Sequence, residues 1–284
     1  SALSPGGGVC GGVDLRLDLA TGAEATPVLP ATSGALVPFG DAVAAYTRTY
    51  QYSPTDGCPS TDGPVTVYDA ATGAARWAGE PGGRPVVIDD QLLSPVGSTV
   101  QAYDAAGCGA PTCAPLWTAQ LPGAAGQTSA AGAFAYALVP FSTPATLVAL
   151  DRATGAVAWT AGFPDLWPGS MTLADGAVHV VSDGALSTFD AAGCGAPTCS
   201  PMWTADLGGA AAGGVISGGG LVFQGLADGR VVAFDAAGCG AATCSPLATV
   251  TVAGTPRGLV VDGGRLFVTS TSGSTSSVTA FAPA

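Results

Sequence analysis

The chain has 284 residues, of which only 10% are charged, and its 8 basic and 20 acidic residues give a net charge of −12. This balance disfavours a nucleic-acid partner, because phosphate neutralisation needs a basic face. No apolar run reaches the roughly 18 residues of a membrane-spanning helix. The 48% hydrophobic residues, 43 Gly and 22 Pro are typical of an all-β chain with short strands and many turns.

The first element expected along the chain is a strand at residues 13–20, "VDLRLDLA". The residues before it, "SALSPGGGVCGG", contain neither a charged nor an apolar segment of the kind found in signal peptides. We therefore expect any export signal to have been removed already or to lie outside the sequence given.

A long irregular segment is expected next, at residues 47–64, "TRTYQYSPTDGCPSTDGP". Long loops on a rigid scaffold often carry binding, and Tyr and Arg are enriched at interface hot spots. Arg48, Tyr50 and Tyr52 are therefore candidate binding residues. The alternative is an ordinary surface loop held by Cys58.

A motif, Asp-x-x-Thr-Gly-x-x-x-Trp, recurs in "YDAATGAARW" (68–77) and "LDRATGAVAW" (150–159). A longer form, as in "FDAAGCGAPTCSPMW" (189–203), keeps the Asp and the Trp but has five more residues between them. We predict that the Asp accepts backbone hydrogen bonds at a turn, that Thr-Gly makes the turn, and that the Trp packs between neighbouring repeats. These structural positions are Asp69, Asp104, Asp151, Asp190 and Asp235, with Trp77, Trp117, Trp159 and Trp203.

The spacing of the motif predicts the fold. Its Asp position falls at 18, 69, 104, 151, 190, 235 and 282, a mean spacing of 44 residues, since six steps cover 264 residues. Such a period in a β-rich chain is typical of four-stranded propeller blades. We predict an all-β fold, a single β-propeller domain over residues 1–284, with six four-stranded blades in this chain and seven possible.

The predicted blades cover approximately residues 21–70, 71–105, 106–152, 153–191, 192–236 and 237–284. In this division the cysteine-bearing insertions connect the outer strand of one blade to the inner strand of the next. The terminal "SSVTAFAPA" is the outer strand of the last blade. The strand at 13–20 is then an extra strand of that blade, or part of a seventh blade outside this chain.

The eight cysteines predict disulfides, because six of them form three C-x4-C pairs. A zinc site needs closely spaced ligands that converge, which these separated pairs do not provide. Haem attachment needs a C-x-x-C-H motif, which the sequence lacks. Free redox thiols and a metal site are the alternatives. A calcium site at the Asp-Gly turns of Asp56 and Asp62 is a separate alternative. The expected pairs are Cys108–Cys113, Cys194–Cys199, Cys239–Cys244 and Cys10–Cys58, each short ring adding about 2 kcal/mol of stability. Disulfides imply export to the cell surface, the periplasm or the medium.

The Asp and Trp positions resemble those of the PQQ-repeat β-propeller family, which includes the outer-membrane assembly factor BamB and the quinoprotein alcohol dehydrogenases. The closest matches are Asp69, Thr72, Gly73 and Trp77, and Asp151, Thr154, Gly155 and Trp159. The resemblance covers nearly the whole chain. It implies a propeller, but it indicates function only weakly.

Quinoprotein membership would further imply the cofactor PQQ, a calcium site with Glu, Asn and Asp ligands, an Asp base, and two adjacent cysteines. This chain has no Asn or Lys, only Glu24 and Glu80, and no adjacent cysteines. A Ser-His-Asp arrangement would depend on His179, which "GAVHVVSDG" indicates to be a strand residue used in packing. We therefore expect no cofactor, no metal and no catalytic residue.

The sequence predicts an exported, non-catalytic propeller that acts as a platform for protein–protein contact in the cell envelope or an extracellular complex. Trp167, in "FPDLWPGS", lies outside the repeat register and joins the candidate binding residues. The alternative is a propeller that binds a small molecule or a glycan at a central funnel, including a sensor domain of a larger receptor. A PQQ-type oxidoreductase is the third possibility.

Overall fold

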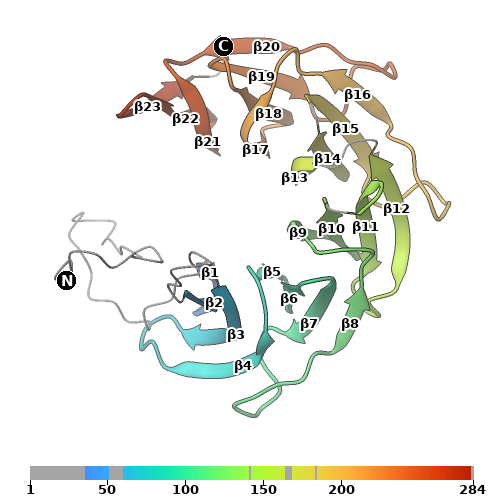
Figure 1. Ribbon diagram of the computed structural model, residues 1–284, viewed down its shortest axis with the longest axis vertical. Helices are drawn as coiled ribbons and strands as arrows, with labels where there is room; N and C mark the ends of the chain where they lie inside the picture. Colours follow the sequence, from blue (N-terminus) through green and yellow to red (C-terminus); the bar gives the residue numbers. More distant parts are fainter. Residues whose placement is uncertain (1–35, 51–59, 141, 164–167, 183, 283–284) are drawn as a thin grey trace, which may run out of the picture. The chain divides into compact units, whose positions relative to one another are not determined.

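The computed structural model describes residues 36–50, 60–140, 142–163, 168–182 and 184–282, with the backbone alone at 47–50, 60, 61 and 168. These residues form β-strands joined by turns and loops (Figure 1), so the all-β prediction is confirmed. The part described includes no helix long and apolar enough to cross a membrane. By contact the chain divides into two compact units, residues 1–120 and 121–284, and each is described by itself. The prediction of one domain over residues 1–284 stays a prediction.

Unit 1 contains two four-stranded antiparallel sheets, in which strands pair in chain order. Blade 1 consists of β1 (Leu36–Phe39), β2 (Ala42–Tyr50), β3 (Ser60–Asp69) and β4 (Ala75–Pro81). Blade 2 consists of β5 (Val86–Ile88), β6 (Gln91–Val96), β7 (Thr99–Asp104) and β8 (Trp117–Gln120).

Unit 2 contains three further four-stranded sheets and one sheet with three strands in the described residues. Blade 3 is β9 (Gln127–Ala131), β10 (Phe134–Val139), β11 (Ala145–Asp151) and β12 (Val157–Phe163); blade 4 is β13 (Pro168–Ala174), β14 (Ala177–Ser182), β15 (Ala185–Asp190) and β16 (Trp203–Asp206). Blade 5 is β17 (Ala211–Gly218), β18 (Leu221–Leu226), β19 (Arg230–Asp235) and β20 (Ala248–Thr251); blade 6 is β21 (Thr255–Asp262), β22 (Arg265–Ser272) and β23 (Thr275–Phe281).

The six blades are those of the predicted propeller, but their limits differ from the prediction by one strand. The strand that carries the motif Trp belongs to the same sheet as the strand that ends in the motif Asp, because the turn between them reverses the chain. Val67 pairs with Trp77, Ala149 with Trp159, and Thr188 with Trp203. The sequence repeat therefore ends one strand earlier than the structural blade.

The last blade has three strands in the described residues, where blades 1 to 5 have four. β23 contains "TSSVTAF", pairs with β22, and is the last described strand of this sheet. The assignment of this segment as the outer strand stays a prediction. The predicted strand at residues 13–20 lies outside the described residues.

The hydrophobic core consists of layers between successive blades. The layer between blades 3 and 4 joins Tyr136, Leu147, Trp159, Val178 and Phe189, all at most 4% exposed. Equivalent layers lie between blades 1 and 2 and between blades 4 and 5. Each blade therefore buries the faces of its sheet against its neighbours in the same unit, as the packed layers of a repeat protein require.

Candidate functional site

The cysteine-bearing insertions are loops between the third and fourth strands of a single blade, at residues 105–116, 191–202 and 236–247. We call them the clasp loops. The prediction that they connect successive blades is wrong, because the chain folds back into the same sheet after each loop. Other segments, such as residues 82–85 and 207–210, carry the chain from one blade to the next.

Each clasp loop contains one disulfide ring. The bridges are Cys108–Cys113, Cys194–Cys199 and Cys239–Cys244, as the C-x4-C spacing predicts. In each ring the first cysteine is exposed and the second is at most 6% exposed. Cys10 and Cys58 lie outside the described residues.

Each clasp loop makes two backbone hydrogen bonds with the preceding blade. In unit 1 the Ala78 N–H donates to the carbonyl oxygen of Pro111 at 2.9 Å, and the Cys113 N–H donates to the carbonyl oxygen of Ala78 at 2.8 Å. In each blade, the residue that makes both hydrogen bonds with the clasp loop directly follows the motif Trp. The same pair of bonds is made at Thr160 by Pro197 and Cys199, and at Thr204 by Ala242 and Cys244.

A glycine of the clasp loop lies directly on the motif Trp of the preceding blade. Gly107 has φ +89°, and a Cβ atom there would lie 2.6 Å from Trp77 Cδ1, so only glycine fits. The Trp77 indole N–H donates to the carbonyl oxygen of Ala105 at 3.3 Å. Gly193 on Trp159 and Gly238 on Trp203 repeat this contact.

The predicted packing role of the motif Trp is confirmed for three of the four. Trp77, Trp159 and Trp203 are 2–4% exposed, and each ring packs on an aromatic ring of the next blade, at centroid distances of 5.7–6.4 Å. Those partners are Tyr103, Phe189 and Phe234. Trp117 is half-buried at the start of β8.

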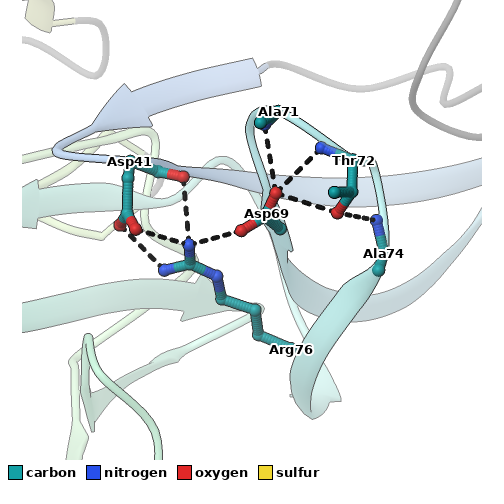
Figure 2. Close-up of polar contacts among 6 residues, drawn as sticks. All are labelled: Asp41, Asp69, Ala71, Thr72, Ala74 and Arg76. Atoms are coloured by element: carbon teal, nitrogen blue, oxygen red, sulfur yellow. Dashed lines mark hydrogen bonds and ion pairs between the residues drawn. The ribbon is translucent and has the colours of Figure 1, made fainter.

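The motif Asp residues cap the turn after the third strand, as predicted. Asp69 Oδ1 accepts hydrogen bonds from the N–H groups of Ala71 and Thr72 and from the Thr72 hydroxyl, at 2.8–3.1 Å (Figure 2). Asp151 makes the same three bonds in its own turn. In the clasp loops Asp104, Asp190 and Asp235 each accept one N–H two residues further on.

Arg76 adds an ion-pair network to blade 1 (Figure 2). Its guanidinium donates to both carboxylate oxygens of Asp41, at 2.8 and 2.9 Å, and to Asp69 Oδ2 at 2.7 Å. Asp41 lies in the turn between β1 and β2, while Asp69 ends β3, so one side chain on β4 joins both turns at this end of the blade.

The network keeps its members charged. The hydrogen bond from Arg76, followed by those from Thr72, holds the pKa of Asp69 well below its usual value. The hydrogen bond and charge of Arg76 also lower the pKa of Asp41, and the two carboxylates raise the pKa of Arg76. A network fixed in this way stabilises the turns and does not exchange protons near neutral pH.

A cavity of about 370 Å³ opens next to this network, between β4 and the first clasp loop. Its lining residues are Arg76, Trp77, Ala106, Gly107, Gly109, Ala110 and Pro111. Arg76 brings the charge of this lining, and a guanidinium remains protonated in proteins. The guanidinium beside this cavity is already paired with Asp41 and Asp69, and the lining residues carry no nucleophile or general base.

His179 is a buried packing residue, as the strand pattern indicates. It lies in β14 with no exposed surface, its Nδ1 is 2.9 Å from the Thr188 hydroxyl, and its ring packs on Trp203 at 6.1 Å. Burial lowers its pKa to about 4, so the ring is neutral at pH 7.

The predicted binding segment is less irregular than expected. β2 continues to Tyr50 and β3 begins at Ser60, with Arg48 opposite Asp62 in the antiparallel pair. The Thr and Tyr residues of this segment favour strands, and this preference extends the hairpin into residues read as a loop. The side chains of Arg48 and Tyr50 are not described, and Tyr52, Asp56 and Trp167 lie outside the described residues. Their binding roles stay predictions.

Sequence reasoning missed Arg76 and Asp41. A signal was present, because the position before the motif Trp holds Leu116, Ala158 and Met202 in other repeats and a charged residue in blade 1 alone. Asp41 gives no such signal, since it lies 35 residues from its partner in an ordinary turn.

Residues 96–195 match the family model described as outer membrane protein assembly factor BamB. This segment belongs to the PQQ-repeat β-propeller family. The matched segment covers the end of blade 2, all of blade 3 and most of blade 4. It includes the first clasp loop, the Asp151–Trp159 motif and the start of the second clasp loop as far as residue 195. No curated protein matches the sequence.

Three solved structures share the propeller fold with this chain. The computationally designed Ika8 protein has 16% identity and a TM-score of 0.66, over 87% of this chain and 71% of that chain. BamB from Moraxella catarrhalis has 20% identity and a TM-score of 0.60, over 90% and 73%. Hsv2 from Kluyveromyces lactis has 10% identity and a TM-score of 0.55, over 80% and 67%. Identities this low establish the fold alone.

Proposed function

We propose that this chain is an exported, non-catalytic β-propeller that serves as a scaffold for protein–protein contact in the cell envelope or in an extracellular complex. The observation that carries the proposal is the match of residues 96–195 to a family described as an outer membrane assembly factor. An assembly factor works by contact with other proteins, and a rigid propeller provides a surface for such contacts.

The three disulfide rings support export. Disulfides form and persist in oxidising compartments and are rare in the cytosol. Each ring has one exposed cysteine, which cytosolic thiols would reach and reduce. The protein isolated from its own organism is therefore expected to carry no alkylatable thiol in any C-x4-C pair.

The scaffold function is tested by recovering the native protein from the envelope and the medium of its own organism under mild conditions. Mass spectrometry is expected to find one protein partner in stoichiometric amount. Recovery of the propeller without any protein partner, from both fractions, would overturn the proposal.

A second candidate function, small-molecule or glycan binding, is favoured by the cavity of about 370 Å³ beside Arg76. Its volume lies in the range of ordinary ligand pockets. The test is a ligand-observed NMR screen of mono- and disaccharides and small organic acids, repeated on Ala110→Trp, which fills the cavity. A ligand that binds the wild type and not the variant would support this function. Equal binding to both proteins would exclude the cavity as the binding site.

A further inference from the structure

An exposed apolar side chain lies at the start of the fourth strand, or directly before it, in four successive blades. Leu116, Val157, Met202 and Leu247 are 63%, 54%, 50% and 64% exposed. Val157 is the first residue of β12, while the others directly precede β8, β16 and β20. Val157, Met202 and Leu247 lie in unit 2, one on each of blades 3, 4 and 5, and we call these three residues the rim row.

The rim row lies at one end of the sheets because of their antiparallel order. The turn between the first and second strands and the connection between the third and fourth meet at that end. Backbone hydrogen bonds join them in each blade, from Ala191 to Gly176 and from Ala236 to Gly220, both at 2.9 Å. The rim row therefore shares this end with the motif Asp residues.

The clasp loops place the members of the rim row on adjoining elements. The loop that ends in Met202 is bonded to Thr160, three residues after Val157. The loop that ends in Leu247 is bonded to Thr204, two residues after Met202. The three side chains thus follow one another across blades that are in direct contact.

The surroundings of the rim row are acidic. Asp151, Asp175, Asp190 and Asp235 lie at this end of blades 3–5, together with a single basic residue, Arg152, which donates to the Gly132 carbonyl oxygen at 2.6 Å. The two clasp loops of this unit contain no charged residue. The end of blades 3–5 that carries the rim row therefore also carries four carboxylates and one basic side chain.

The geometry points to the rim row as a docking surface for a segment of a partner protein that combines apolar side chains with Lys or Arg. Burying exposed apolar side chains supplies affinity, and the carboxylates select a basic partner and speed its approach. This inference rests on the proposed scaffold function, and it names the face used and the chemistry of the segment that binds.

The test uses two fluorescein-labelled 18-residue peptides, one of Lys and Leu and one of Glu and Leu, titrated against the full chain. The Lys/Leu peptide is expected to bind at least tenfold more tightly than the Glu/Leu peptide. It is also expected to lose at least tenfold in affinity on the triple variant Val157→Ser, Met202→Ser, Leu247→Ser. The matched control is Val260→Ser, Val278→Ser, two residues of blade 6 that are 59% and 68% exposed, and it is expected to bind like the wild type.

A smaller loss on the triple variant, an equal loss on the control, or tight binding of the Glu/Leu peptide would each overturn the inference. If the triple variant fails to fold, Asp175→Asn, Asp190→Asn, Asp235→Asn replaces it. Asn keeps the side-chain oxygen with which Asp190 and Asp235 cap their turns, and it tolerates the positive φ of Asp175. This variant therefore removes charge with little change in local structure. The Asn variant is expected to bind the Lys/Leu peptide at least tenfold more weakly than the wild type, and its binding is expected to depend less on salt.

The native partner separates the two proposals. A stoichiometric partner that is recovered equally with the wild type and the triple variant would support the scaffold function but would overturn the proposal that the rim row is the docking surface. Loss of that partner from the triple variant and not from the control would support both.

Discussion

Arg76 is the residue at which blade 1 departs from the other repeats, and its effect is electrostatic. The pKa values of Asp41 and Asp69 are depressed in the folded protein, so the network stabilises it above the ordinary carboxyl pKa of 3.8. This contribution is lost as the pH falls below 3.8, because the unfolded chain takes up the protons first.

Arg76→Met introduces the residue type that blade 4 carries at this position. It is expected to lower thermal stability at neutral pH and to reduce the further loss of stability on acidification. Thermal melts between about pH 6 and about pH 2 measure both effects. Arg84→Met is the control, since Arg84 is exposed and its loss changes the net charge equally. Identical melts for the two variants would contradict a specific role of the network.

His179 provides a second pH test, in which burial and not an ion pair lowers the pKa. Its pKa is about 4 in the folded chain against 6.5 for an ordinary His, so the unfolded state binds a proton that the folded state does not. Stability is expected to fall as the pH drops from about 6.5 to about 4, by on the order of 3 kcal/mol in total. His179→Leu is expected to remove this slope in urea denaturation, and an unchanged slope would show that another group titrates.

At the scale of the element, the contact between clasp loop and motif Trp is open to a matched comparison. Gly193 and Gly195 both have positive φ, +87° and +76°, but a Cβ atom at 193 would lie 2.6 Å from Trp159 Cδ1, while one at 195 meets nothing within 4 Å. Gly195→Ala is expected to cost about 1–2 kcal/mol from backbone strain. Gly193→Ala adds about 1–3 kcal/mol of steric conflict. Equal losses in denaturant unfolding would mean that the loop moves away from the Trp freely.

The sequence predicts the repeating elements well, but not where one blade ends. The Asp cap, the Thr-Gly turn and the buried Trp follow from local chemistry, so their roles were readable from residues such as Asp69 and Trp77. A sequence repeat gives the spacing of the blades, whereas hydrogen bonding between strands determines at which strand each blade begins and ends. The repeat alone therefore places the strand after each Asp in the wrong sheet, and it places each clasp loop between two blades instead of within one.

The site was predicted less well for a different reason. The three disulfides join cysteines five residues apart, and this spacing is visible in the sequence. The ion pairs of Arg76 with Asp41 join residues 35 apart, whose proximity depends on how β1 and β4 pack into one sheet. The rim row arises in the same way, from the alignment of three blades.

At the scale of the whole molecule, we expect the disulfides to reinforce a core that forms without them. The blade layers consist mainly of aromatic and aliphatic side chains, and the buried cysteine of one ring packs into each of three layers. Reduction is therefore expected to lower the melting temperature and to leave a cooperative transition. Loss of each ring costs about 2 kcal/mol in the chain-entropy model. Melts with and without a reductant measure the effect, with Cys239→Ser, Cys244→Ser as the single-ring reference. Disappearance of the β-sheet circular dichroism signal on reduction at room temperature would contradict this expectation.

The short rings also determine how the protein matures after synthesis. Six cysteines can pair in 15 ways, and scrambled pairings usually require an isomerase to correct them. Here the correct partner of each cysteine lies five residues away, so both cysteines of a pair reach an oxidising compartment almost together. Oxidation of these pairs is therefore expected to be a local event that needs no contact between distant parts of the chain. We therefore expect production of the folded protein in a foreign host to depend on access to an oxidising compartment, and not on the correction of mispaired bridges among these six residues.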